Sequence, residues 1–235
     1  MIYFFADDHY GVHPGKVLSG HFPQTLKANM TFHENDWSIL EQSPWPKDCE
    51  LLILDMIGET CSLPHPNADA EKNMLEYCQR GGNILLLHGA SAAFWRWDWW
   101  RTFCGLRWVR PNDPDGVAPS THPVESYELT VTKTRHPLAR RLHGFSLPTD
   151  EIYTDLEQTA PLDILMTTQV GGVTWPQLVE TTSEFGGKIV SFLPGHAPEV
   201  TGNTETVKTV LTLIDYLLRI KGMRPCPSIL RSQPD

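Results

Sequence analysis

One segment limits the possible folds most strongly, a run of four apolar residues, Ile84–Leu87, that stops at His88. A short continuous apolar run is typical of a strand buried on both faces of a sheet. The small residues that follow, Gly89 to Ala93, predict a tight turn into a helix. In open α/β sheets ligands bind beyond the carboxyl ends of the parallel strands, and a strand–turn–helix corner there often carries a nucleophile. Here the corner carries the imidazole of His88 in place of a Ser or Cys nucleophile, which narrows the possible reactions of the site.

The first half of the chain alternates apolar runs with segments of helical periodicity, which predicts a parallel sheet covered by helices on both faces. The helix before Gly81 and Gly82 is the clearest, because apolar residues recur there at helical spacing and the two glycines end it. The predicted strands are Ile2–Ala6, Ala28–His33, Leu51–Met56 and Asn83–Leu87, and the predicted helices are Gly15–Ala28, Asn67–Arg80 and Ser91–Phe103.

The second half reads differently, as short β-like runs after a long proline-rich loop, Arg110–Pro123. Loops of this length are often functional, so we expect a lid or an interface arm. The later expected strands are Glu125–Thr132, Glu151–Tyr153, Ile164–Gln169, Gly172–Glu180 and Lys188–Leu193, followed by a helix, Thr204–Ile220. We therefore predict one mostly parallel α/β domain over residues 1–221 with β-rich insertions in its second half, and a C-terminal tail over 222–235.

Composition and charge exclude several classes of protein. The net charge of −9 argues against nucleic acid as a partner, because phosphates require a basic face. No apolar run approaches the roughly 18 residues of a membrane span, and the acids Asp7 and Asp8 interrupt the N-terminal segment, which we interpret as a strand. The five cysteines are widely spaced and form no CxxC pair, which favours reduced thiols and a cytoplasmic location.

Histidines gather at the predicted strand ends. His88 and His196 each end an apolar strand, so both face one sheet edge if the strands are parallel. Imidazole transfers protons well near neutral pH, although both could instead bond loop carbonyls. Asp8, His9 and His13 follow the first strand and add a polar cluster at the same edge. Carboxylates and imidazoles there could also bind a divalent metal such as zinc or manganese.

Further candidates come from four short motifs. His122 precedes a proline, which places it in an extended segment. Asp150-Glu151-Ile152-Tyr153 puts two carboxylates at a predicted strand start. They could act as a base or a metal ligand, or the segment could be a solvated acidic turn. The aromatic run 94–100 gives core residues, but Trp95 suits a sugar-stacking wall or an oligomer interface. Glu199 could orient His196 by accepting a hydrogen bond from its ring.

The ordered motifs resemble those of the ThuA-like (trehalose-utilisation) proteins, relatives of the class I glutamine amidotransferases. They are His88-Gly89-Ala90, the aromatic segment, His122-Pro123, His136-Pro137, Asp150 to Tyr153, and Gly186-Gly187-Lys188 leading to Gly195-His196. The resemblance implies a flavodoxin-like sheet. In the amidotransferases a Cys stands where His88 stands here, which makes thiolate-dependent glutamine hydrolysis unexpected for this chain. His196 and Glu199 look similar to the amidotransferase His and Glu, but with one extra residue between them.

The resemblance also implies a role in the metabolism of trehalose or keto-disaccharides. A ketone at C3 of a sugar acidifies the hydrogens at C2 and C4, so a base can form an enediolate that leads to isomerisation or glycosidic cleavage. We expect His88, His196, Glu151 and His122 to be catalytic, with His88 or His196 as base and the other as donor. The expected substrate-binding residues are Asp8, His9, His13, Trp95, Tyr153 and Glu199.

Two alternatives remain beside this acid–base enzyme acting on a small sugar. One is a metal-dependent hydrolase or lyase on the same scaffold, and the other is a non-catalytic domain that binds a small molecule or a partner protein. A homo-oligomer is expected from the aromatic segment and from the frequency of symmetric assemblies.

Overall fold

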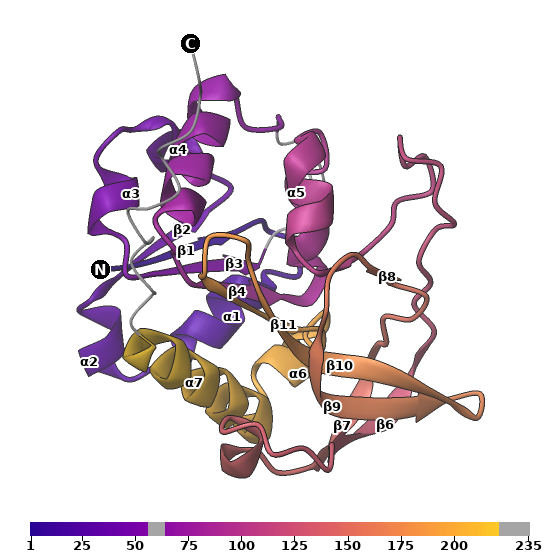
Figure 1. The fold of residues 1–235 in the computed structure, drawn as a ribbon. Helices are drawn as coiled ribbons and strands as arrows, with labels where there is room; N and C mark the ends of the chain where they lie inside the picture. Colours follow the sequence, from indigo (N-terminus) through magenta and orange to yellow (C-terminus); the bar gives the residue numbers. More distant parts are fainter. Residues whose placement is uncertain (56–63, 221–235) are drawn as a thin grey trace.

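The computed structural model describes residues 1–55 and 64–220 of the chain. Its centre is a nine-stranded sheet with the strand order β2-β1-β3-β4-β11-β10-β9-β6-β7 (Figure 1). The predicted tail over 222–235 lies outside the described residues. In the described part of the chain no helix is long and apolar enough to cross a membrane.

The first five strands of this order are parallel, as the apolar runs predict. Because β4 pairs in register with β11, with Leu87 opposite Phe192, the chain segments that follow both strands leave the sheet at one edge. The parallel strands are β1 (Ile2–Ala6), β2 (Met30–Glu34), β3 (Leu51–Asp55), β4 (Ile84–Leu87) and β11 (Lys188–Phe192).

The other four strands are antiparallel and extend the same sheet, so the predicted insertions continue the main sheet. They are β6 (Val124–Val131), β7 (Phe145–Glu151), β9 (Asp163–Val170) and β10 (Val173–Thr182). The prediction that Glu151 begins a strand was wrong, because Glu151 is the last residue of β7. A separate pair, β5 (Leu106–Arg107) and β8 (Glu157–Gln158), lies beside the sheet.

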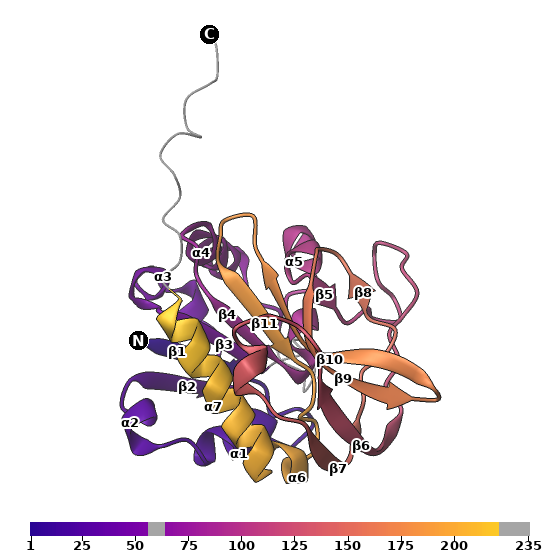
Figure 2. The same ribbon diagram turned by 60° about the horizontal axis from the view of Figure 1, so that its bottom comes forward.

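Helices cover both faces of the parallel half (Figures 1 and 2). One layer holds α3, α4 and α5, and the opposite layer holds α1 and α7. The helices are α1 (Pro14–Gly20), α2 (Gln24–Lys27), α3 (Trp45–Asp48), α4 (Ala68–Gln79), α5 (Asp98–Phe103), α6 (Pro198–Thr201) and α7 (Thr204–Arg219), with 3₁₀ turns η1 (Ser38–Glu41), η2 (His88–Ala92) and η3 (Ala139–Arg141).

Two predicted helices are each broken into shorter elements. The segment 15–28 divides into α1 and α2, because Pro23 has no N–H to continue the first helix. The segment 91–103 begins in the 3₁₀ turn η2 and becomes α-helical only at Asp98. Asn67 caps α4 by accepting hydrogen bonds from the N–H groups of Asp69 and Ala70, which explains where that helix starts.

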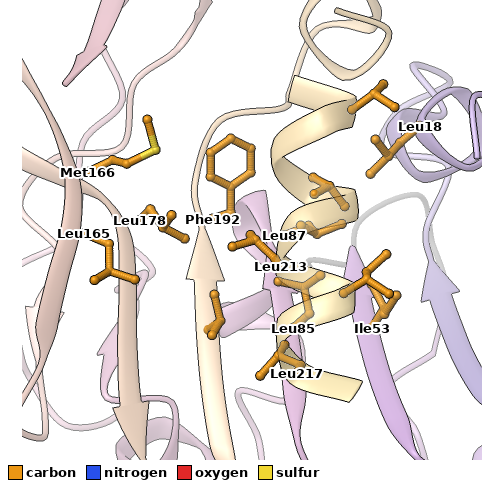
Figure 3. Close-up of a cluster of buried hydrophobic side chains, with 14 of the residues drawn as sticks. Leu18, Ile53, Leu85, Leu87, Leu165, Met166, Leu178, Phe192, Leu213 and Leu217 are labelled. Atoms are coloured by element: carbon orange, nitrogen blue, oxygen red, sulfur yellow. The ribbon is translucent and has the colours of Figure 1, made fainter. Parts of the chain in front are cut away.

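The two helix layers bury opposite faces of each central strand. Leu85 and Leu87 pack with Leu213 of α7 in one apolar cluster, which Figure 3 shows. Ile84 and Leu86 point to the other face and pack in the cluster that includes α3, α4 and α5. Because its side chains alternate between two buried faces, β4 is apolar at all four positions, which is the pattern that the sequence displays.

The loop 110–123 is fixed at its beginning by buried ion pairs. Arg107 has a side chain only 3% exposed, and its guanidinium donates to both oxygens of Asp113 at 2.9 and 3.2 Å. Arg101 binds Asp115 in the same bidentate way at 2.8 and 3.0 Å, and Glu157 of β8 also contacts Arg107. These contacts position the loop beside β5 and β8.

Candidate functional site

Three histidines meet at the carboxyl edge of the parallel strands. His9 follows β1, His88 follows β4 and His196 follows β11. Their ring centroids lie 4.6 Å (His9–His196), 5.5 Å (His88–His196) and 5.6 Å (His9–His88) apart. The expectation that His88 and His196 share one edge is confirmed, and His9 joins them as a third member. We call these residues the histidine trio.

Two members of the trio sit on strained backbone. His88 has φ of 48° and His9 has φ of 44°, both in the left-handed region that residues with a side chain rarely adopt. Such strain costs on the order of 1–3 kcal/mol per residue and concentrates at functional sites. The sharp turn at His88 is also the backbone feature that presents a nucleophile in strand–turn–helix corners.

Hydrogen bonds fix the ring of His88. Its Nδ1 donates to the carbonyl of Leu193 at 3.0 Å, which leaves Nε2 with a lone pair facing the site. The hydroxyl of Tyr153 lies 2.9 Å from that Nε2. Burial, with nearby carboxylates, raises the pKa of Tyr153 well above its usual value, so the phenol keeps its proton and donates to His88.

Glu151 is the common neighbour of the surrounding imidazoles. Its carboxylate oxygens lie 3.4 Å from Nδ1 of His196, 3.5 Å from Nδ1 of His122 and 3.6 Å from Nε2 of His88. Its side chain is 18% exposed, so a ligand can reach it. Burial alone would raise the pKa of Glu151, but the contact with His88 and the nearby His196 lower it below its ordinary value. Glu151 is therefore an ionised, accessible carboxylate.

The three histidines of the trio differ in pKa. Burial lowers the pKa of His9 to about 3, and the neighbouring His88 and His196 add to the effect, so His9 is neutral. Burial also lowers the pKa of His196, against the opposing charge of Glu151. For His88 burial acts in the same direction, but the Glu151 carboxylate at 3.6 Å and the hydrogen bond with Leu193 outweigh it and raise the pKa.

Asp150 holds the loop that carries His196. Its carboxylate accepts hydrogen bonds from the backbone N–H groups of Gly195 at 2.9 Å, His196 at 3.4 Å and Ala197 at 2.8 Å. Asp150 is buried, and it precedes Glu151 at the end of β7. The antiparallel half of the sheet therefore supplies both carboxylates to the edge formed by the parallel half.

The aromatic wall of the site is Trp108. Its ring centroid lies 4.2 Å from that of Tyr153 and 5.5 Å from that of His122. Trp95, which the sequence suggested for this role, lies between the guanidinium groups of Arg96 and Arg110 at 5.3 and 5.4 Å from its ring centre. The remaining aromatic residues of the run, apart from the half-buried Trp99, are buried in the core.

Three other predicted residues do not contact the trio in the way that the sequence suggested. Asp8 exchanges hydrogen bonds with Asn35, through its backbone N–H at 2.8 Å and its carboxylate at 2.9 Å. His13 lies 3.0 Å from Glu34 of β2. Glu199 is exposed on α6, and the carboxylate beside the ring of His196 is Glu151.

Sequence reasoning missed Trp108, Asp55 and the role of Asp150. Asp55 ends the apolar strand β3 in the same way that His88 ends β4, and this was the available signal. Burial raises the pKa of Asp55 to about 7, with His88 lowering it and Asp7 raising it. Among the described residues, the free cysteines are Cys49, Cys78 and Cys104, and they lie in or against the apolar cluster that contains α3, α4 and α5.

Comparisons with known proteins identify the family of the chain. A family model described as ThuA, trehalose utilisation, matches residues 51–217, which include His88, His122, Glu151 and His196. A search among curated proteins finds no significant match.

Solved structures share the fold at low sequence identity. A ThuA-like protein from Parabacteroides merdae superposes with a TM-score of 0.69 at 18% identity, covering 97% of this chain and 92% of that one. A ThuA-like protein from Bacteroides uniformis gives 0.64 at 13% identity, covering 92% and 91%. A glutamine amidotransferase from Thermotoga maritima gives 0.53 at 10% identity, covering 93% and 99%. The sheet is thus flavodoxin-like, as predicted, with an antiparallel extension.

Proposed function

The chain belongs to the ThuA family, and we propose that it is an enzyme that removes a proton from the carbon beside the ketone of an oxidised sugar. The observation that carries the proposal is the position of Glu151, an accessible carboxylate within 3.6 Å of three imidazoles. Enolisation requires a proton acceptor at the carbon beside the ketone and a group that stabilises the enolate oxygen. The family description, trehalose utilisation, supports a disaccharide as the parent sugar.

The roles follow from position and exposure. Glu151 takes the proton, since it is a carboxylate that a ligand can reach. The C–H electron pair then forms a C=C bond, and the carbonyl oxygen becomes an enolate oxygen. That oxygen is placed among the imidazoles beside Glu151, and its negative charge must be stabilised there. Tyr153 fixes the orientation of the His88 ring through the 2.9 Å hydrogen bond.

The enediolate has two fates with balanced chemistry. Protonation on the neighbouring carbon isomerises the sugar. Expulsion of the group on the carbon β to the ketone breaks the glycosidic C–O bond, and the leaving oxygen takes up a proton. His122, 47% exposed and 3.5 Å from Glu151, is placed to relay protons between the site and water in either case. Trp108 offers a ring face against which a sugar can stack.

Among the residues that the structure describes, thiol chemistry has no support at this site. The elbow position holds His88, and burial raises the pKa of Cys49 to about 12 and that of Cys104 well above its usual value. A buried protonated thiol is a poor nucleophile. The reduced cysteines among the described residues are compatible with the cytoplasmic location that we propose.

Proton exchange provides the test. The protein is incubated in deuterated buffer with a panel of 3-keto-disaccharides, including 3-keto-trehalose, and the sugar C–H signals are followed by NMR. We expect loss of the signal beside the ketone, with or without glycosidic cleavage, and a rate at least about 100-fold lower in Glu151→Gln. Glu128→Gln, an exposed change on β6, is the matched control. Ligand binding without exchange by any sugar would replace this proposal with a binding domain.

A further inference from the structure

The histidine trio has the geometry of a metal-binding site. The ligand atoms His9 Nε2, His88 Nε2 and His196 Nδ1 all lie within 4.8 Å of one another. The closest pair, His9 Nε2 and His196 Nδ1, is 2.8 Å apart. Zinc–nitrogen bonds of about 2.05 Å in a tetrahedral site place the nitrogens about 3.3 Å apart. The nitrogen–nitrogen distances therefore need to change by about 0.5 to 1.5 Å for the three nitrogens to bind one zinc ion.

The atoms behind the trio orient these lone pairs. Nδ1 of His88 donates to the carbonyl of Leu193, so the lone pair of the ring is on Nε2, which accepts from Tyr153 and which a metal ion would take over from that hydroxyl. Nδ1 of His9 faces the carboxylate of Asp7 at 3.8 Å, and Asp7 is itself held by the backbone N–H of His9. Metal-ligating histidines commonly have a carbonyl or a carboxylate at the second nitrogen, which fixes the tautomer and the ring.

The charge around the trio also suits a cation. Asp7, Asp55 and Asp150 are buried at the ends of β1, β3 and β7, and Glu151, 18% exposed, lies beside His88 and His196. Carboxylates placed around imidazoles favour the binding of a divalent ion.

We propose that His9, His88 and His196 bind one zinc ion and that its fourth position accepts the carbonyl oxygen of the substrate. This inference rests on the proposed function, because it names what stabilises the enolate oxygen. Three imidazoles with an open fourth position are a known catalytic arrangement for zinc. Glu151 Oε2, 3.4 and 3.6 Å from two of the donors, then stands beside the ion as the base.

A second cluster, His136, Asp163 and Glu180, is the competing location for a metal. There Nζ of Lys188 lies 2.7 Å from Glu180, so an ammonium already compensates the buried carboxylate. This cluster lies away from the carboxyl edge, on β9 and β10. A variant in this cluster, His136→Ala, therefore distinguishes metal binding there from metal binding at the histidine trio.

The test measures metal binding without any sugar. The full-length protein is stripped with a chelator, its zinc content is measured by mass spectrometry, and zinc is then titrated against a chromophoric chelator. We expect one zinc per chain, and the visible absorption of a tetrahedral site when cobalt replaces zinc. His196→Ala, at a half-exposed position, should lower the affinity at least about 100-fold, since changes behind metal ligands alone typically cost 10- to 100-fold. His136→Ala and the exposed His143→Ala should leave it unchanged.

Two results would overturn the zinc site: no measurable zinc or cobalt binding by the folded, stripped protein, or binding that His136→Ala abolishes and His196→Ala preserves. Circular dichroism of each variant separates lost ligands from lost folding. The zinc site and the proposed function can be refuted independently of each other. Proton exchange by a zinc-free protein that binds no metal refutes the zinc site alone, whereas zinc binding without exchange by any keto-sugar refutes the function alone.

Discussion

Asp150 links the fold to the site, and replacing it gives the most informative stability experiment. In Asp150→Asn the shape is kept and one oxygen still accepts a hydrogen bond. The other oxygen becomes an NH₂ group, which faces a backbone N–H of the segment 195–197 where it previously accepted one. The change therefore sets a donor against a donor in a buried position.

The expected cost follows from the two short bonds, at 2.8 and 2.9 Å. A hydrogen bond to a charged group contributes about 1.5–3 kcal/mol, and a buried N–H left without an acceptor costs about 1–3 kcal/mol. Partial relaxation keeps the sum below the maximum, so we expect the free energy of unfolding to fall by about 3 kcal/mol. For a chain of this size that lowers Tm by about 6–12 °C.

Thermal and urea unfolding followed by tryptophan fluorescence measure this change, with the exposed Asp48→Asn on α3 as the control. Exchange activity should fall together with stability, because the segment that Asp150 holds carries His196. A Tm within about 2 °C of the wild type would refute the reasoning, since it would mean that water satisfies the N–H groups and that Asp150 does not fix the loop.

Three further changes test other parts of the structure. Arg107→Ala strands the buried carboxylate of Asp113 and should cost about 3–5 kcal/mol in urea unfolding; a loss below about 1 kcal/mol would mean that the loop is not clamped. Leu213→Ala opens a cavity in the cluster of Figure 3 and should cost about 2–5 kcal/mol, with no change in zinc affinity. Tyr153→Phe should leave Tm within a few degrees but slow proton exchange roughly 10-fold or more, because the ring of His88 loses its hydroxyl partner; an unchanged rate would remove Tyr153 from the site.

The parallel half of the fold could be predicted because its strands are buried on both faces. Four consecutive apolar residues between a glycine pair and His88 favour a buried strand, and two such parallel strands in one sheet bring their following residues together. The meeting of His88 with His196 was therefore predictable from local sequence. His9 was placed at the same edge for the same reason, although its contact with His196 depends on a left-handed backbone that the sequence does not reveal.

The contributions of the antiparallel half could not be predicted in the same way. Glu151 was identified as a site residue, but its position at the end of β7 depends on long-range pairing with β6, which leaves little periodic signal. Trp108 sits in an irregular segment after β5, and its contact with Tyr153 joins residues 45 positions apart. The break between η2 and α5 could not be predicted, because alanine and tryptophan are both compatible with a helix and tertiary packing decides where the helix begins.

Chemical rescue tests the central claim, that Glu151 accepts the proton, most directly. Glu151→Ala is assayed for deuterium exchange on the best keto-disaccharide with and without added formate. The account predicts that the variant is nearly inactive and that formate, entering the vacated space beside His196 and His122, restores exchange in proportion to its concentration. Full exchange by the variant without formate would contradict the claim.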